Sequence, residues 1–274
     1  MQKFALRRIR NSGITMIVVA LVWLWVRARE RGLSPTSFAT GYLMLAAVLF
    51  LAAYNIRKKL PFLPVGSSTA WLQWHLYVGI GSVGVFALHA GLRLPTGILE
   101  SALAAAYLAT VGSGVVGLYL TRTIPGQLAR VGDEVLYERI PALNLQVQRQ
   151  AGELIIQSVT ASGATTLADF YVGRLYDFFH RSRGAAYFLR PTTTLRRSLM
   201  GEMQNLRRYL SEAEAAACER LFSLVRRKDD LDFHRARQGL LKKWLFAHIG
   251  LTYVLVVLAI LHGLLALAFR GGAL

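Results

Sequence analysis

Cysteine and acidic residues are scarce in this 274-residue chain, and each shortage argues against a class of protein. The single cysteine, Cys218, excludes an intramolecular disulfide framework, a cysteine-rich zinc site, an iron–sulfur cluster on the chain's own thiolates and covalent c-type haem. Charged residues make up only 17% of the chain, against roughly 25% in an ordinary soluble domain. Because 54% of the residues are hydrophobic, the composition also argues against a plain water-soluble globule.

Long apolar runs are what the sequence has instead. A membrane-spanning helix needs roughly 20 mainly apolar residues, and five runs qualify, with charge, proline or aromatic residues at their ends. They extend approximately over Phe4 to Val26, Phe38 to Ile56, Trp71 to Leu92, Ile98 to Leu120 and Trp244 to Phe269. We therefore predict an all-α integral membrane protein built on a five-helix transmembrane bundle. The first run resembles a signal peptide without a cleavage site, so we expect an uncleaved signal anchor.

The basic residues predict how the chain is oriented. Most of the 32 lysines and arginines fall on one side of the membrane if the N-terminus is cytoplasmic, as the positive-inside rule requires. This interpretation gives a multi-pass protein of the cell (inner) membrane with its C-terminus outside.

A second part of the chain is predicted between the fourth and fifth runs. Most of the 15 acidic residues lie there, the apolar residues have helical spacing, and Ser211 with Glu214 matches a capping box. The predicted domains are transmembrane helices 1 to 4 in residues 1–120, a cytoplasmic helical domain inserted at 121–240, and helix 5 with the C-terminal tail at 241–274.

Four of the six histidines lie inside predicted spans, where ionisable side chains are costly and indicate function. His75 and His89 lie in the third run, and His248 and His262 in the fifth. Each pair is 14 positions apart, which returns to within about 40° of the same helix face and rises roughly 21 Å. Both helices run outward in the predicted topology, with the first histidine near the start. We therefore expect His75 to face His248 near the cytoplasmic side, and His89 to face His262 near the outer side.

Two opposed neutral imidazoles at one depth are the ligands of a bis-histidine haem iron. The two levels predict two stacked, non-covalent b haems, the inner one on His75 and His248 and the outer one on His89 and His262. Zinc and di-iron sites need three or four clustered ligands, which two distant pairs do not provide. A histidine in a span can also bond a neighbouring helix, so a haem-free membrane scaffold or transporter stays open as an alternative of another class.

The spacing His75-x13-His89 together with His248-x13-His262 resembles the membrane domain of the ferric reductase and NADPH oxidase group, di-haem b-type cytochromes. The resemblance covers the spans and implies electron transfer across the membrane through the same two ligand pairs. The sequence differs from that group in its five spans instead of six, its long insertion and its lack of a C-terminal flavin and nicotinamide domain. The electron donor is therefore expected to be a separate dehydrogenase, a small carrier or quinol. Whether the chain is an enzyme or an electron-transfer subunit of an oxidoreductase stays open.

Four further residues are candidates for contact with the haems. Arg93, at the outer end of the third run, would neutralise a propionate on the side where basic residues are few. Gly79 and Gly84 have no side chain, so they let a macrocycle or another helix approach the backbone. Trp74 would pack on the inner haem or belong to the interfacial aromatic belt. Candidates for the inner propionates are Arg57, Lys58, Lys59, Arg122, Lys242 and Lys243.

Two glycine strings and two further histidines have simpler interpretations. Residues 79–84 and 112–117 both match G-x-G-x-x-G, but they lie in apolar runs and follow no predicted strand, which favours helix packing over nucleotide binding. His180 and His234 lie in the inserted domain, where a solvated or capped histidine is the favoured interpretation. His234 precedes His248 by 14 residues and could extend the histidine face inward, although Gly239 weakens the helix between them, so a third haem stays open.

The expected partners follow from these features. They are membrane lipid, a redox protein such as a dehydrogenase or a cytochrome c, and a quinone. Within the redox class, the alternative function is a quinol-oxidising cytochrome b subunit of a larger complex. The basic excess of the inserted domain suits a cytoplasmic partner or anionic lipid, whereas its many acids argue against nucleic acid.

Overall fold

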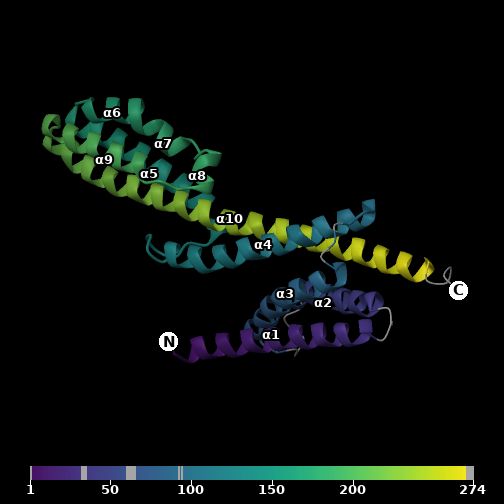
Figure 1. Ribbon diagram of the computed structural model, residues 1–274. Coiled ribbons are helices and arrows are strands. Elements are labelled where there is room, and N and C mark those ends of the chain that lie inside the picture. Colours follow the sequence, from purple (N-terminus) through teal and green to yellow (C-terminus); the bar gives the residue numbers. More distant parts are fainter. Residues whose placement is uncertain (1, 32–35, 60–65, 92, 94, 270–274) are drawn as a thin grey trace. The chain divides into compact units, whose positions relative to one another are not determined.

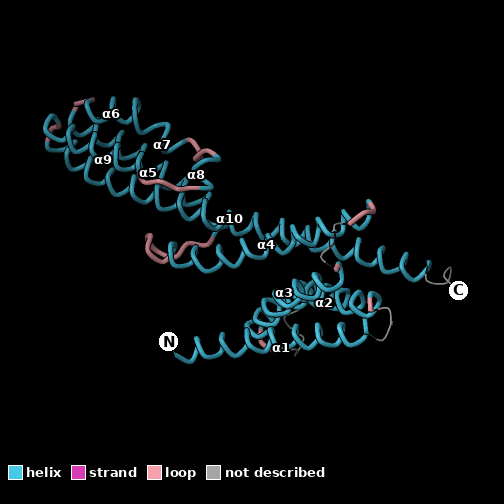
Figure 2. The backbone as a smooth tube through the Cα atoms, viewed as in Figure 1, coloured by secondary structure: helices cyan, strands magenta, loops and turns pink. Residues whose placement is uncertain are grey.

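The computed structural model describes residues 2–31, 36–59, 66–91, 93 and 95–269. In this part of the chain all regular structure is helical and no strand forms, with 88% helix, so the all-α prediction is confirmed (Figure 2). The end of the predicted third run, Leu92, lies outside the described residues, and so do the side chains of Phe4, Lys58 and Lys59.

The chain divides into two compact units. The first consists of Met1–Val115 together with Phe246–Leu274, and the second of Val116–Leu245. Two long helices, α4 (Ile98–Leu128) and α10 (Glu212–Ala268), contribute to both units.

In the first unit, α3 (Ser68–Ala90) packs against α1 (Gln2–Arg31) and α2 (Ser37–Lys59), as Figure 1 shows. Glycine makes one of these contacts close, because a Cβ atom on Gly84 would lie 2.6 Å from Cγ1 of Val19 in α1. A Cβ atom on Gly81 would lie 3.3 Å from Cγ2 of Thr15, also in α1. The first glycine string therefore serves helix packing, as the sequence predicted.

Four helices are long and apolar enough to cross a membrane among the described residues: Leu6–Arg29, Ser37–Arg57, Ile98–Leu128 and Glu212–Ala268. This is consistent with a multi-pass membrane protein, but the predicted count of five is not confirmed because α3 does not qualify. Helix α3 has the required length and no Asp, Glu, Lys or Arg. Its mean hydropathy is lowered by His75, His89 and Gln73, together with several glycines and tryptophans.

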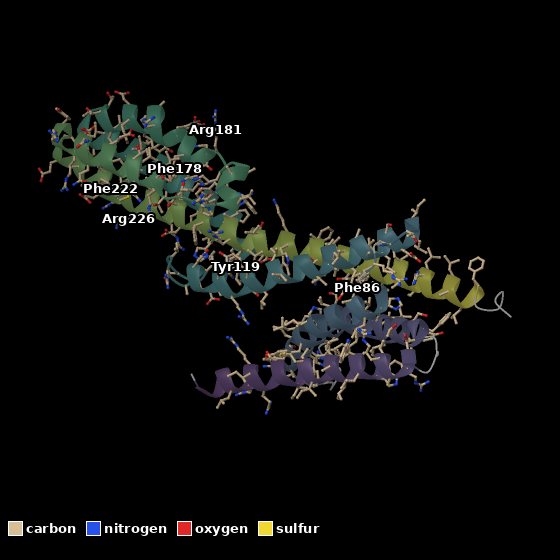
Figure 3. All side chains as sticks on the ribbon, in the orientation of Figure 1. Phe86, Tyr119, Phe178, Arg181, Phe222 and Arg226 are labelled. Carbon is tan, nitrogen blue, oxygen red and sulfur yellow. The ribbon has the colours of Figure 1, made fainter. Side chains whose placement is uncertain are left out.

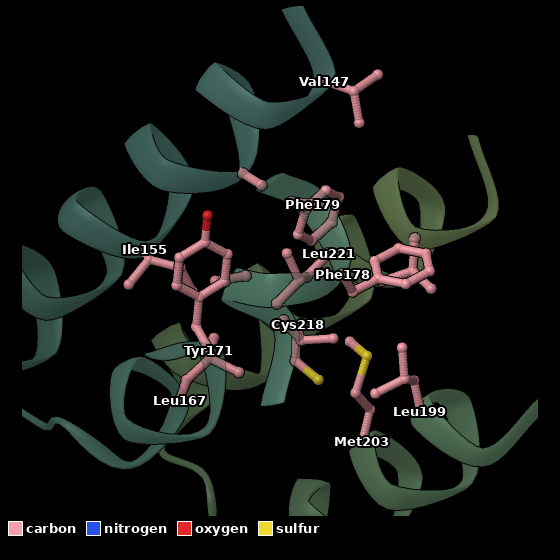
Figure 4. Close-up of a cluster of buried hydrophobic side chains, with 14 of the residues drawn as sticks. Val147, Ile155, Leu167, Tyr171, Phe178, Phe179, Leu199, Met203, Cys218 and Leu221 are labelled. Atoms are coloured by element: carbon pink, nitrogen blue, oxygen red, sulfur yellow. The ribbon is translucent and has the colours of Figure 1, made fainter. Parts of the chain in front are cut away.

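In the second unit, four helical segments pack on the first part of α10: α5 (Ile140–Ser162), the helical run Thr166–His180 that contains α6 and α7, α8 (Ala185–Leu189) and α9 (Thr194–Leu206). Their apolar faces meet in a core whose fully buried members include Leu167, Leu175, Leu199, Met203 and Leu221 (Figure 4). The helical spacing of apolar residues that the sequence shows in this part of the chain therefore builds this core.

Helix α10 begins at the predicted capping box. The carboxylate of Glu214 accepts the backbone N–H of Ser211 at 3.1 Å, and the Ser211 hydroxyl accepts the backbone N–H of Glu214 at 3.4 Å. The helix then continues without a break through Gly239, which the sequence treated as a weak point. The Phe188 ring of α8 lies directly against Gly239, so the missing side chain leaves room for the ring and does not interrupt the helix.

Candidate functional site

Helices α3 and α10 bring His75, His89, His248 and His262 together as two pairs within the first unit. The ring centroids of His75 and His248 lie 6.3 Å apart with an interplanar angle of 74°. Those of His89 and His262 lie 6.5 Å apart at 86°. These are the two pairs expected from equal depth, and in each pair the two rings come from different helices.

The His248 ring is held by a hydroxyl from α4. Its Nδ1 lies 2.6 Å from Oγ of Ser113, and the same Ser113 hydroxyl donates to the Thr110 carbonyl at 2.8 Å. A serine hydroxyl has one proton. When that proton goes to the carbonyl, the Ser113 oxygen accepts from the Nδ1–H of His248, so the direction of this bond depends on the tautomer of the ring.

The His89 ring is held in the same way by a hydroxyl from α2. Its Nδ1 lies 3.0 Å from Oγ1 of Thr40, a residue only 2% exposed. The Thr40 hydroxyl points at the carbonyls of Thr36 and Ser37, both at 3.1 Å, and donates its proton there. When it does so, the Thr40 oxygen accepts from the Nδ1–H of His89, so here too the direction of the bond depends on the tautomer of the ring.

His75 has different surroundings. Its Nδ1 is buried and has no hydrogen-bond partner among the described residues. The ring of Tyr54 in α2 lies 5.2 Å from the His75 ring, between centroids, at 41°. The inner pair therefore combines one histidine anchored by a hydroxyl with one that has an unsatisfied buried nitrogen.

A polar and aromatic contact lies halfway along α3 between the two histidine levels. Ser82, seven residues from both His75 and His89, is buried, and its Oγ lies 2.9 Å from the phenol oxygen of Tyr107 in α4. The ring of Tyr107 stacks on Phe86, labelled in Figure 3, with centroids 4.4 Å apart. Packed side chains of α3 and α4 therefore occupy the space at this height, between the two histidine levels.

The other predicted site residues lie in varied surroundings. A Cβ atom on Gly79 would meet no atom within 4 Å, whereas Gly84 faces Val19 of a neighbouring helix. Trp74 is 62% exposed and Arg93 is exposed. Gly79 therefore leaves open space on α3, while Gly84 is used for helix packing.

The two remaining histidines have ordinary partners. His234 is buried, with Nε2 2.7 Å from the Val131 carbonyl oxygen. His180 is exposed, and its Nδ1 lies 2.8 Å from the carbonyl oxygen of Tyr176. Both fit the favoured interpretation of a capped or satisfied histidine.

Sequence reasoning missed the residues that contact the histidine rings from the side. Besides Thr40 and Ser113, these are Gly41, whose Cβ atom would lie 3.1 Å from Cε1 of His89, and Gly114, whose Cβ atom would lie 3.8 Å from Cε1 of His248. Hydroxyl and glycine residues inside apolar runs were the available signal. Which of them faces a histidine depends on how the helices pack, and the sequence does not specify that.

No group of three or more His, Cys, Asp or Glu side chains able to hold a metal ion occurs among the described residues. In the described part of the chain, the four histidines meet as two pairs. No family model, curated protein or solved structure matches the chain.

Proposed function

We propose that this protein is a transmembrane b-type cytochrome that holds two haems, the inner on His75 and His248 and the outer on His89 and His262, and carries electrons across the membrane. The observation that supports the proposal most is the meeting of the four histidines as two cross-helix pairs. The 14-residue spacing within each helix separates the two levels by roughly 21 Å of helix rise.

The distances within the pairs suit one metal ion between two imidazoles. A histidine nitrogen bonds a first-row metal at about 2.0 Å, and with about 1.2 Å from nitrogen to ring centre, two opposed rings have centroids roughly 6.4 Å apart. The observed separations of 6.3 and 6.5 Å agree with this value. The open space beside Gly79, one turn from His75 on α3, also fits a site built to hold a further group.

The chain's own residues supply position and environment. Ser113 and Thr40 hold one ring of each pair in the form with Nδ1 protonated and Nε2 unprotonated, which is the form that would bind iron through Nε2. The apolar helices around them exclude water. Bound haem supplies one-electron redox chemistry, with a potential set by its ligands and surroundings.

The sidedness of the proposal comes from the positive-inside rule, which gives a cytoplasmic N-terminus and an outer C-terminus in the inner membrane. The second unit is then cytoplasmic, and it is the natural docking site for an electron donor such as a dehydrogenase, with quinol as a membrane donor. The outer pair would deliver electrons to an outer acceptor such as a cytochrome c or ferric iron. Two bound histidines saturate the iron, so an acceptor would be reduced at the haem edge.

Haem content in variants tests the proposal. We expect about two b haems per chain in the detergent-purified protein. His75→Ala and His248→Ala should lose one and the same haem, and His89→Ala and His262→Ala the other, as seen in low-temperature reduced-minus-oxidised spectra. His180→Ala is the matched control, because this exposed histidine bonds a backbone carbonyl of its own helix.

Electron paramagnetic resonance adds a geometric test. Histidine rings held at 74° and 86° to each other would leave two iron d orbitals nearly degenerate, so both haems should give strongly anisotropic low-spin signals. Loss of haems across the pairs instead of within them would contradict the ligand assignment. Absence of haem from protein made with ample haem supply would overturn the proposal in favour of a haem-free scaffold or transporter.

A further inference from the structure

Each histidine pair has one ring bonded to a hydroxyl, and both hydroxyls come from helices that carry none of the four histidines. Ser113 of α4 contacts His248 in the inner pair, and Thr40 of α2 contacts His89 in the outer pair. The same contact between a hydroxyl and a histidine ring thus occurs once at each level, and the two hydroxyls belong to different helices.

In both contacts the hydroxyl also bonds a backbone carbonyl of its own helix. The Ser113 proton is used by the Thr110 carbonyl, and the Thr40 proton by the carbonyl of Thr36 or Ser37. A neutral imidazole has one N–H, and the hydrogen bond at one nitrogen decides which nitrogen has it. The geometry therefore favours the Nδ1–H tautomer in both rings, with Nε2 unprotonated.

We infer that Ser113 and Thr40 are positioning residues that select the Nδ1–H tautomer of His248 and His89 and so tune the inner and outer metal sites independently. The redox consequence rests on the proposed function, whereas the tautomer assignment does not. A hydrogen bond accepted from Nδ1–H orients the ring and makes the opposite nitrogen more basic, and losing such a partner costs about 10- to 100-fold in metal affinity. A more basic ligand favours ferric iron, so losing the bond should raise that haem's midpoint potential.

The first test uses the full-length protein prepared without haem. In ¹⁵N NMR spectra of detergent micelles at a pH where the rings are neutral, His248 and His89 should be Nδ1–H tautomers. Ser113→Ala should lower the Nδ1–H population of His248 alone, and Thr40→Ala that of His89 alone. Nε2–H tautomers in the wild type would overturn the inference whether or not the protein binds haem.

The second test uses the haem-loaded protein. Ser113→Ala should weaken haem binding about 10- to 100-fold and raise the midpoint potential at the inner level only, and Thr40→Ala should do so at the outer level only. The conservative variants Ser113→Thr and Thr40→Ser keep the hydroxyl and should restore both properties. Thr252→Ala is the matched control, because the Thr252 hydroxyl bonds the His248 carbonyl at 2.8 Å and not its ring.

The outcomes separate the two proposals. Wild-type protein that binds no haem contradicts the proposed function and leaves the NMR result to decide the tautomer inference. Wild-type protein with two haems, whose potentials and affinities stay unchanged in both alanine variants, overturns the tuning role while the proposed function stands. A shift of both haems by either variant would also overturn it, since the two hydroxyls then do not act locally.

Discussion

The buried carboxylate of Glu214 accepts several hydrogen bonds in the second unit, so removing it should strongly destabilise that unit. The residue is 1% exposed, and its oxygens accept the backbone N–H of Leu167 at 3.0 Å and both the backbone N–H and the hydroxyl of Ser211 at 3.1 Å. It thus joins the start of α6 to the start of α10. Glu214→Ala would remove all three bonds at once.

The cost can be worked out from these contacts. Leaving the buried Leu167 N–H unsatisfied costs about 1–3 kcal/mol, and losing the cap at Ser211 costs about 1 kcal/mol. We therefore expect Glu214→Ala to destabilise the second unit by about 3 kcal/mol, which corresponds to roughly a 100-fold change in its opening equilibrium. Glu214→Gln keeps an acceptor of the same shape, and should cost about 1 kcal/mol.

The charge of Glu214 also makes stability depend on pH. Burial raises the pKa of this carboxyl, but the hydrogen bonds from Leu167 and Ser211 outweigh burial and hold the pKa below its usual value. Its contribution is therefore complete above the unfolded-state pKa of about 4.3, and it is lost as the pH falls through the lower, folded-state pKa. The Glu214→Gln variant should show less loss of stability in that acidic range than the wild type.

Hydrogen exchange measured by mass spectrometry on the full-length protein in micelles would check these values. Amides of the second unit that exchange through its opening should exchange roughly 100-fold faster in Glu214→Ala. Glu212→Ala, which removes an exposed carboxylate from the same helical turn, is the matched control and should leave exchange unchanged. Equal exchange rates in wild type and Glu214→Ala would refute the reasoning, because a buried N–H would then have lost its acceptor at no cost.

Three further predictions concern other parts of the chain. Gly41→Ala should press on the His89 ring at 3.1 Å and weaken haem binding at the outer level about tenfold in a haem titration, whereas Gly114→Ala, with ordinary contact at 3.8 Å, should not affect the inner level. Cys218 should resist maleimide in the native protein and react only after unfolding, because it is fully buried and burial raises the pKa of its thiol to about 11. Asp232→Ala should destabilise the second unit by about 3–5 kcal/mol in denaturant titrations, because it leaves a buried lysine without its counter-charge.

The sequence predicted the features that depend on the regular spacing of residues along one helix. Apolar spacing predicted the helices that build the core around Leu199 and Met203, and the capping box predicted the start of α10. The histidine spacing predicted which rings meet, because two positions 14 apart on one helix share a face. In each case the information lies within one helix.

Features that depend on a second helix were not predictable in this way. Nothing in the sequence distinguishes Ser113 or Thr40 from other hydroxyls in apolar runs, and only helix packing shows that they touch a histidine. Gly84 could have faced a cofactor or a helix until its contact with Val19 was known. The continuity of α10 through Gly239 likewise depends on the Phe188 ring of another helix, which fills the space beside that glycine.

Helix α3 is not among the helices apolar enough to cross a membrane, because several of its side chains are polar. Two histidines and a glutamine lower the mean hydropathy of this helix, and polar side chains on a membrane helix are tolerated when they face protein. Helix α3 packs against both α1 and α2, with Gly81 and Gly84 giving α1 a close approach, and His89 bonds Thr40 of α2. Substituting Gly84 with a large residue should therefore separate α3 from α1, leave the polar side chains of α3 less sheltered from lipid, and lower the yield of membrane-inserted protein even though no histidine is changed. Normal insertion of Gly84→Leu would show that α3 needs no such shelter.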